Sequence, residues 1–219
     1  MKIKDCFRSI FLSRWQEKLI ILFFQIFLLI EYCMSFPIKY GQNIFNTYAA
    51  TDLNFIFMNL DWIAYYFCGE FYLLGTLQNK LLATNPLMVI RNPKRTMIFR
   101  TIITTSALFS ALYNLFFTGL LFGLKAGHID LLFLLQLFMT LWLSFFTFTL
   151  FLLLISIIGG VAITRIFAIL ISLFSLGLKT NMLTMVTTTD WSTATWSNLI
   201  WSVCLFILVY VLNQKIEIK

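Results

Sequence analysis

Six long apolar runs, separated by short polar stretches, dominate the pattern of hydrophobic and polar positions along this chain. A helix rises about 1.5 Å per residue, so about 20 apolar residues cross the hydrocarbon core of a bilayer. The runs predict six transmembrane helices, at residues 19–36, 53–74, 101–124, 131–158, 161–178 and 199–212. The sixth is expected to begin near Trp196. Because only Gly159 and Gly160 separate the fourth and fifth runs, these two form a predicted tight helical hairpin.

Residues 1–18 predict a helix lying in the plane of the membrane interface. Their apolar side chains fall close to one helical face, whereas most basic side chains fall elsewhere. The apolar set is Ile3, Phe7, Ile10, Phe11 and Trp15, and the basic set is Lys2, Lys4, Arg8, Arg14 and Lys18. This pattern is typical of an amphipathic interfacial helix with a tryptophan anchor. A frayed basic tail is the alternative, and no cleavable signal peptide is expected.

Residues 180–198 have an intermediate character, because they are rich in Thr, Ser and Trp and almost uncharged. They are too polar for an ordinary span and too apolar for a solvated loop. Backbone at membrane depth must be helical or sheltered by protein. We therefore expect an external segment that dips into the outer leaflet as one or two short helices. A plain interfacial loop is the alternative.

The composition agrees with a membrane protein. The 219 residues are 60% hydrophobic and 11% charged, whereas a soluble domain averages about 25% charged residues. The fold class is therefore predicted to be an all-α polytopic membrane protein, with residues 1–219 forming a single transmembrane domain. The net charge of +7 is explained by the position of the basic residues, so nucleic-acid binding is not expected.

Basic residues predict the orientation of the spans, because Lys and Arg are enriched in cytoplasmic loops. With six spans and the N-terminus inside, thirteen of the sixteen basic residues face the cytoplasm: five within residues 1–18, five within 80–100, and Arg165, Lys215 and Lys219. Only Lys39, Lys125 and Lys179 face outward. The chain is thus predicted to be a multi-pass protein of a cell membrane, with both termini inside. A bacterial plasma membrane is expected.

The longest basic connection, residues 78–100, joins the second and third expected spans. Its basic side chains crowd into ten residues with no acidic residue nearby, and two prolines interrupt it. The basic residues are Arg91, Lys94, Arg95 and Arg100, and the prolines are Pro86 and Pro93. Residues 87–90 could form one short amphipathic turn. A cytoplasmic loop of this kind is the natural place for a soluble partner to bind.

Two carboxylic acids, Asp61 and Glu70, lie within the second expected span. An ionisable group there costs on the order of 3 kcal/mol and indicates a functional site by default. The two lie nine residues apart, on nearly opposite sides of one helix, so they do not form a carboxylate dyad. Asp61, with Asn59 nearby, could line a pathway or brace the span against its neighbour.

Glu70 has a structural alternative. It lies near the inner end of its span, where it could form an ion pair with Arg91, Arg95 or Arg165. Neutral polar residues of the third and fourth spans are expected to hydrogen-bond between helices rather than to line a substrate path. They are Tyr113, Asn114, Thr118, Gln136, Thr140, Ser144, Thr147 and Thr149.

Recognisable catalytic and cofactor motifs are absent from the sequence. It contains no HExxH, no GxGxxG and no P-loop, so no nucleotide or catalytic metal site can be assigned. The four cysteines lack metal-ligand spacing, and the single histidine, His128, falls in an external loop. The chain is therefore expected to be no enzyme, and to bind no metal or cofactor itself.

The layout resembles the small permeases of ABC-2 type, the membrane halves of many bacterial ATP-binding-cassette exporters. Those proteins combine an interfacial N-terminal helix, six spans with both ends inside, and short external helices before the last span. They also carry a cytoplasmic coupling helix between the second and third spans, followed by an Arg-x-x-x-Arg stretch. The corresponding stretch here runs from Asn85 to Arg95, where Arg91 and Arg95 supply the two arginines.

The resemblance implies that a separate cytoplasmic ATPase binds ATP and Mg²⁺ and contacts the coupling loop. The loop residues concerned are Asn85, Pro86, Leu87, Met88, Arg91, Lys94 and Arg95. One chain of this size is half a pore, so a second permease subunit, identical or not, is implied along with membrane lipid. A hydrophobic or amphipathic cargo is expected, such as an antimicrobial peptide, in bacteriocin export or self-protection.

Two other functional classes stay open. The chain could be a non-transporting membrane immunity or sensor protein, which would act without an ATPase. It could also be the substrate-binding subunit of an energy-coupling-factor importer. Such a subunit is expected to carry Ala-x-x-x-Ala stripes in its first span, and residues 19–36 have none.

Overall fold

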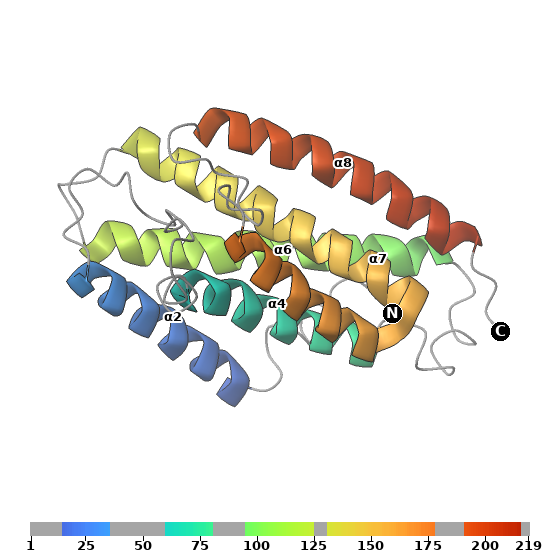
Figure 1. Cartoon of the computed structure of the whole chain (residues 1–219), viewed down its shortest axis with the longest axis horizontal. Helices are drawn as coiled ribbons and strands as arrows, with labels where there is room; N and C mark the ends of the chain where they lie inside the picture. The colour runs from blue at the N-terminus through green and yellow to red at the C-terminus, as the bar shows by residue number, and fades with distance from the viewer. Residues whose placement is uncertain (1–14, 36–59, 81–94, 125–130, 178–190, 216–219) are drawn as a thin grey trace.

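The computed structural model describes residues 15–35, 60–80, 95–124, 131–177 and 191–215, and every one of them is helical (Figure 1). The helices are α2 (Trp15–Ser35), α4 (Leu60–Lys80), α6 (Arg95–Leu124), α7 (Leu131–Gly177) and α8 (Trp191–Lys215). The predicted all-α class is therefore confirmed for this part of the chain.

Three helical segments are long and apolar enough to cross a membrane: Phe99–Leu124, Leu131–Gly159 and Thr195–Leu212. Two shorter apolar helical segments, Lys18–Ile30 and Ala162–Ile171, accompany them. The described residues thus have the features of a helical membrane protein. The number of six spans and the orientation of the chain stay predictions.

Helix α7 turns back on itself near Gly159 and Gly160, as its yellow-to-orange ribbon shows (Figure 1). A Cβ atom placed on Gly159 would lie 3.2 Å from Cβ of Ile163. Residues four apart on a regular helix have Cβ atoms about 5–6 Å apart, so the backbone is sharply bent there. Glycine pairs are a common cause of such kinks. The expected reversal is present, but the helical conformation continues through both glycines without a loop.

Successive described helices alternate in direction along the chain, with the two legs of α7 counted separately. Helices α2 and α6 run one way, whereas α4, α8 and the first leg of α7 run the other way. The contacts that set these directions are Tyr65–Phe117, Tyr72–Phe109, Tyr66–Ser144, Glu70–Thr149, Thr140–Thr195 and Phe99–Tyr210. As a result, the end of α4, the start of α6, the bend of α7 and the end of α8 gather at one end of the bundle (right in Figure 1).

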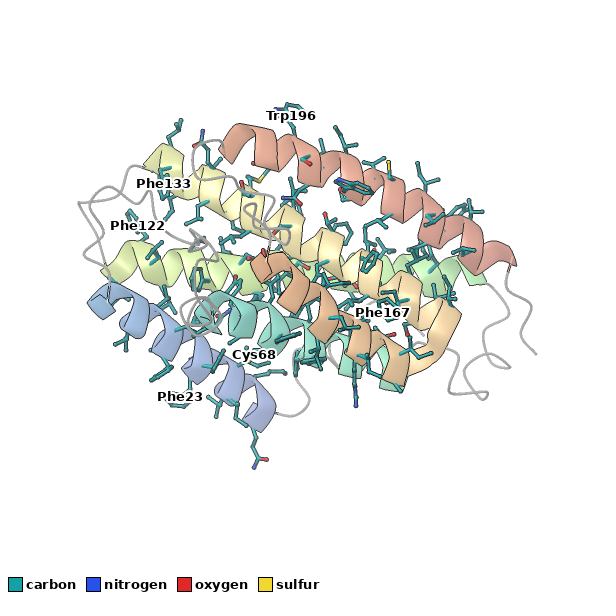
Figure 2. The ribbon with its side chains drawn as sticks, viewed as in Figure 1. Phe23, Cys68, Phe122, Phe133, Phe167 and Trp196 are labelled. Carbon is teal, nitrogen blue, oxygen red and sulfur yellow. The ribbon has the colours of Figure 1, made fainter. Side chains whose placement is uncertain are left out.

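The core lies where α4, α6 and α7 pack against one another. Its fully buried large side chains include Tyr65, Tyr66, Leu73 and Phe145. Large apolar side chains also cover the outside. Phe23 of α2 is 67% exposed and Trp196 of α8 is 66% exposed, and they extend from opposite sides of the bundle (Figure 2). Apolar surface this extensive is typical of contact with lipid or with another membrane protein.

Several boundaries differ from those expected, because hydropathy marks the apolar part of a helix rather than its ends. Residues 15–18 belong to α2, while the rest of the expected interfacial helix lies outside the described residues. The expected loop 78–100 is shorter, since residues 78–80 end α4 and residues 95–100 begin α6. Residues 191–198 form the first two turns of α8, so this part of the expected external segment continues the last helix.

Candidate functional site

Seven buried polar side chains meet where α4 packs against α6 and α7. Helix α4 contributes three of them: Tyr66 and Glu70, four residues apart, share the face toward α7, and Tyr65 faces α6. The members are Tyr65, Tyr66 and Glu70 of α4, Tyr113 and Asn114 of α6, and Ser144 and Thr149 of α7. We call this set the buried polar cluster.

Reciprocal hydrogen bonds join α4 to α6. The hydroxyl of Tyr65 donates to Oδ1 of Asn114 at 2.6 Å, and Nδ2 of Asn114 donates to the carbonyl oxygen of Ser110 at 2.7 Å. In the other direction, the hydroxyl of Tyr113 donates to the carbonyl oxygen of Tyr65 at 2.8 Å. Each of these buried groups is thereby satisfied, as polar groups in a protein interior usually are.

Two further polar pairs join α4 to α7. The hydroxyl of Tyr66 is hydrogen-bonded to Oγ of Ser144. One turn later, Oγ1 of Thr149 lies 2.6 Å from Oε1 of Glu70 and 2.9 Å from the carbonyl oxygen of Phe145. Glu70 is fully buried. Its second oxygen, Oε2, has no hydrogen-bond partner among the described residues.

Gly69 makes this close approach of α4 to α7 possible. A Cβ atom at position 69 would lie 2.5 Å from Cζ of Phe145, which is inside van der Waals contact, so any larger residue would push the helices apart. The ring of Tyr66 stacks on the ring of Phe145, with centroids 5.7 Å apart. Polar bonds and aromatic contacts thus occupy the same interface.

Of the candidate residues expected in the coupling loop and at Asn59, Asp61 and Glu70, Glu70 alone has a described side chain. Asp61 is the second residue of α4 and Arg95 the first of α6, and only their backbones are described. The others lie outside the described residues: Asn59, Asn85, Pro86, Leu87, Met88, Arg91 and Lys94.

Of the three arginines expected as possible ion-pair partners of Glu70, Arg165 is excluded, while the side chains of Arg91 and Arg95 lie outside the described residues. Glu70 faces the first leg of α7 at Thr149, whereas Arg165 lies beyond the bend and is exposed. No ion pair joins the two in the described part of the chain.

The neutral polar residues mostly bond between helices, as expected. Asn114, Ser144 and Thr149 bond to α4, and Thr140 bonds to Thr195 of α8 at 2.6 Å. Gln136 is exposed instead. Sequence reasoning missed Gln25, which is buried and whose Nε2 donates to the carbonyl oxygen of Tyr113 at 3.4 Å. The sequence feature that could have identified Gln25 was a single amide side chain within the first apolar run.

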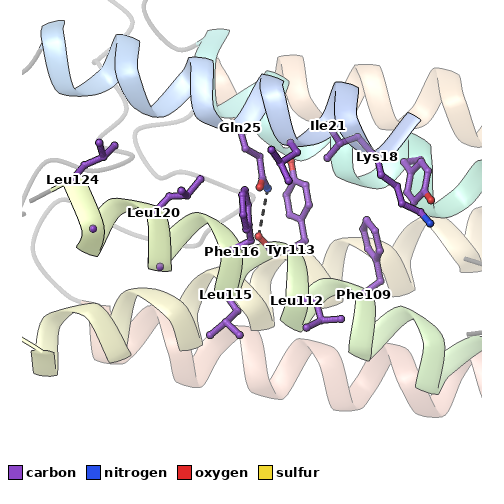
Figure 3. Close-up of a pocket in the computed structure, with 14 residues that line it drawn as sticks. Lys18, Ile21, Gln25, Phe109, Leu112, Tyr113, Leu115, Phe116, Leu120 and Leu124 are labelled. Carbon is purple, nitrogen blue, oxygen red and sulfur yellow. Dashed lines mark hydrogen bonds between the residues drawn. The ribbon is translucent and has the colours of Figure 1, made fainter. Parts of the chain in front are cut away.

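An apolar groove of about 760 Å³ lies between α2 and α6 (Figure 3). Lys18 lies near one end, Gln25 reaches across the middle, and Gly119 and Gly123 leave open space on α6. Its remaining lining residues are Ile21, Leu22, Tyr72, Phe109, Leu112, Tyr113, Leu115, Phe116, Leu120 and Leu124. Such a surface can accept an apolar chain but offers little chemistry.

The described residues contain no group of three or more His, Cys, Asp or Glu side chains that could hold a metal ion. What the buried polar cluster can do is hold helices in register and keep one carboxyl group away from water. No family model matches the sequence, and no curated protein or solved structure matches it significantly. What the chain does must be inferred from its own residues.

Proposed function

We propose that this chain is the permease half of an ATP-binding-cassette transporter in a bacterial plasma membrane. A separate cytoplasmic ATPase would drive it, and the cargo would be a hydrophobic or amphipathic molecule such as an antimicrobial peptide. The observation that carries the proposal is the basic connection between α4 and α6. Both helix ends that border it, at Lys80 and Arg95, lie at the end of the bundle where α8 also ends (Figure 1).

The hydrogen bonds of the buried polar cluster suggest how a displacement of this connection would be transmitted to the other helices. Helices α4 and α6 are tied by the bonds between Tyr65, Asn114 and Tyr113. Helix α4 is also tied to α7 through Glu70 and Thr149. A partner that binds differently in two states shifts the equilibrium between them. Closure of an ATPase on the connection would therefore move α4 and α6 together and change their packing on α7.

Dense packing of the core supports the need for a second permease subunit. Tyr65, Tyr66 and Phe145 are each at most 1% exposed, so the centre of the described bundle is filled by side chains. A substrate path is more easily formed between two chains than through one. Asp61 and Asn59, near the start of α4, are proposed to face such a path.

Affinity purification from native membranes tests the proposal. The tagged protein is extracted in mild detergent, and the proteins that copurify are identified by mass spectrometry. We expect a P-loop ATPase in stoichiometric amount. The triple variant Arg91→Glu, Lys94→Glu, Arg95→Glu should lose the ATPase, whereas the matched triple variant Lys39→Glu, Lys125→Glu, Lys179→Glu should retain it.

The absence of an ATPase in several detergents and in lipid nanodiscs would overturn the proposal. The membrane immunity or sensor function would then be favoured, because it needs no ATPase. An ATPase that copurifies together with a common energy-coupling subunit would instead indicate the importer.

A further inference from the structure

One hydroxyl proton is shared between two oxygen neighbours at Thr149. Its Oγ1 lies 2.6 Å from Oε1 of Glu70 and 2.9 Å from the carbonyl oxygen of Phe145. A threonine hydroxyl carries one proton, and a carbonyl oxygen only accepts. If Thr149 donates to Phe145, the short contact with Glu70 needs a second proton, and a carboxyl group can supply it only when protonated.

Neighbouring residues of α4 show the same arrangement. The hydroxyl of Tyr65 donates to Asn114, whose amide donates to a carbonyl oxygen of its own helix. The hydroxyl of Tyr66 bonds to Ser144, whose hydroxyl lies 3.2 Å from the carbonyl oxygen of Leu141. In both cases a side chain of α4 can donate to a polar side chain on a neighbouring helix. That second side chain in turn bonds to a carbonyl oxygen of the helix to which it belongs. Glu70 completes this series only as a neutral acid.

We propose that Glu70 is a proton-binding site, which carries a proton at neutral pH and donates it to Oγ1 of Thr149. Thr149 in turn donates to the carbonyl oxygen of Phe145. An ionised carboxylate would need donors at both of its oxygens, but Oε2 has none among the described residues and the side chain is 0% exposed. A neutral acid leaves only one uncharged oxygen unpaired, which is the smaller penalty.

Among the side chains that the structure describes, none around Glu70 supplies a positive charge to balance an ionised form. In the described helices, the titratable groups that interact with it are the phenols of Tyr66 on α4 and Tyr113 on α6. On α7, Arg165 is exposed and forms no ion pair with Glu70 in the described part of the chain. A metal ion would need several oxygen ligands, and the described residues contain no cluster of acidic or metal-binding side chains. A proton is the ligand that fits.

Release of this proton would leave a charge buried between α4 and α7. Such a charge is tolerated only with water or a partner, so release requires the two helices to separate or water to enter. The site would therefore respond to the packing of α4 against α7. This inference does not depend on an ATPase partner, since it rests on the contacts of Glu70 alone.

Infrared spectroscopy tests the protonation directly. The purified protein is measured near neutral pH in a detergent without ester groups, where a protonated carboxyl absorbs apart from carboxylates and amides. We expect a carboxyl band that disappears in Glu70→Gln and is kept in Glu31→Gln, which changes a glutamate of α2. The band should shift in Thr149→Val, which lacks the hydroxyl, and return in Thr149→Ser, which restores it.

Stability against pH gives a second readout. A folded protein that holds a proton which the unfolded chain releases loses stability as pH rises. Above neutral pH, the unfolding equilibrium constant of the wild type should rise up to tenfold per pH unit relative to that of Glu70→Gln. Equal pH slopes, or a carboxyl band that persists in Glu70→Gln, would overturn the proposal. If Glu70→Gln does not fold, the band shifts of the two Thr149 variants decide, and an unshifted band in Thr149→Val overturns it.

Discussion

Gly69 of α4 lies directly against the ring of Phe145 on α7. A Cβ atom at position 69 would lie 2.5 Å from Cζ and 2.7 Å from Cε2 of that ring, and 3.0 Å from Cζ of Tyr113. Both rings are buried, so neither can move aside without disturbing the core. The missing side chain therefore sets the distance between α4 and α7, and it brings Glu70 within hydrogen-bonding distance of Thr149.

Replacing Gly69 by alanine should destabilise the protein. Alanine gains about 1 kcal/mol of helix propensity over glycine, but overpacking a core typically costs roughly 1–3 kcal/mol. Because two fixed rings border the site, we expect the overpacking term to prevail, and Gly69→Val to be worse. The thermal unfolding midpoint in detergent measures the effect. Gly123→Ala is the matched control, since no atom lies within 4 Å of a Cβ there; equal midpoints for Gly69→Ala and Gly123→Ala would contradict the prediction.

The bond between Tyr65 and Asn114 gives a second prediction. Tyr65→Phe keeps the ring but removes the donor to Oδ1 of Asn114, which lies 2.6 Å away. A buried acceptor left without a donor costs about 1–3 kcal/mol, although bonds between membrane helices average only about 0.6 kcal/mol. We expect a loss of roughly 1 kcal/mol in the free energy of unfolding, measured by denaturant titration in mixed micelles.

Tyr210→Phe is the control for that experiment. Tyr210 is exposed, and its ring contact with Phe99 needs no hydroxyl. Its hydroxyl forms no hydrogen bond within the described helices. If Tyr65→Phe and Tyr210→Phe had the same stability, the bond to Asn114 would contribute nothing measurable.

Periodicity and hydropathy predicted the helical class and most apolar segments, because these depend on local composition. They did not predict where helices end. Residues 78–80 are polar or basic and residues 95–100 include two arginines, yet they continue α4 and α6, since a backbone can stay hydrogen-bonded beyond the apolar stretch. Likewise, Thr195 was expected outside the last span but lies in α8, where it contacts α7.

The candidate site was only partly predictable. The sequence marked Glu70 as an anomaly inside an apolar run and suggested a charged partner. Its actual partner, Thr149, lies 79 positions away in the chain, and nothing in the local pattern links the two. Gly69 was equally hidden, because a glycine in a helix signals close packing only when its neighbour across the interface is known.

The bend of α7 gives a third prediction, about distance rather than stability. Spin labels at Leu143→Cys and Leu170→Cys, in a background without the four native cysteines, would lie about 40 Å apart on a straight helix. Because the helix turns back near Gly159 (Figure 1), we expect a much shorter distance by pulsed electron resonance. A distance near the straight-helix value would contradict the bend.

A larger side chain at the bend of α7 should change the distance between the two spin labels. Gly159→Val places side-chain atoms against Ile163, whose Cγ2 and Cδ1 would lie 3.0 and 3.1 Å from the new Cβ. We expect the distance between the labels to lengthen or its distribution to broaden. Gly75→Val is the control, because a Cβ at that position of α4 meets nothing within 4 Å.

Membrane orientation can be tested with single cysteines in the same background. Thirteen of sixteen basic residues fall on the side predicted to be cytoplasmic, and inverting the chain would reverse that ratio against the known bias. Cysteines replacing Lys39, Lys125 and Lys179 should therefore react with an impermeant maleimide on intact cells. Cysteines replacing Arg8 and Arg91 should react only after the membrane is opened.

Labelling of Arg91→Cys from outside would have a consequence beyond orientation. A cytoplasmic ATPase could not reach a connection that faces outward, so the proposed transport function would fail together with the predicted topology. The proton site would be unaffected, because the contact of Glu70 with Thr149 is the same whichever end of the bundle faces the cytoplasm. If Lys125→Cys is labelled on intact cells and Arg91→Cys is not, the connection between α4 and α6 faces the cytoplasm, where an ATPase can bind it. The affinity purification then decides whether an ATPase does bind.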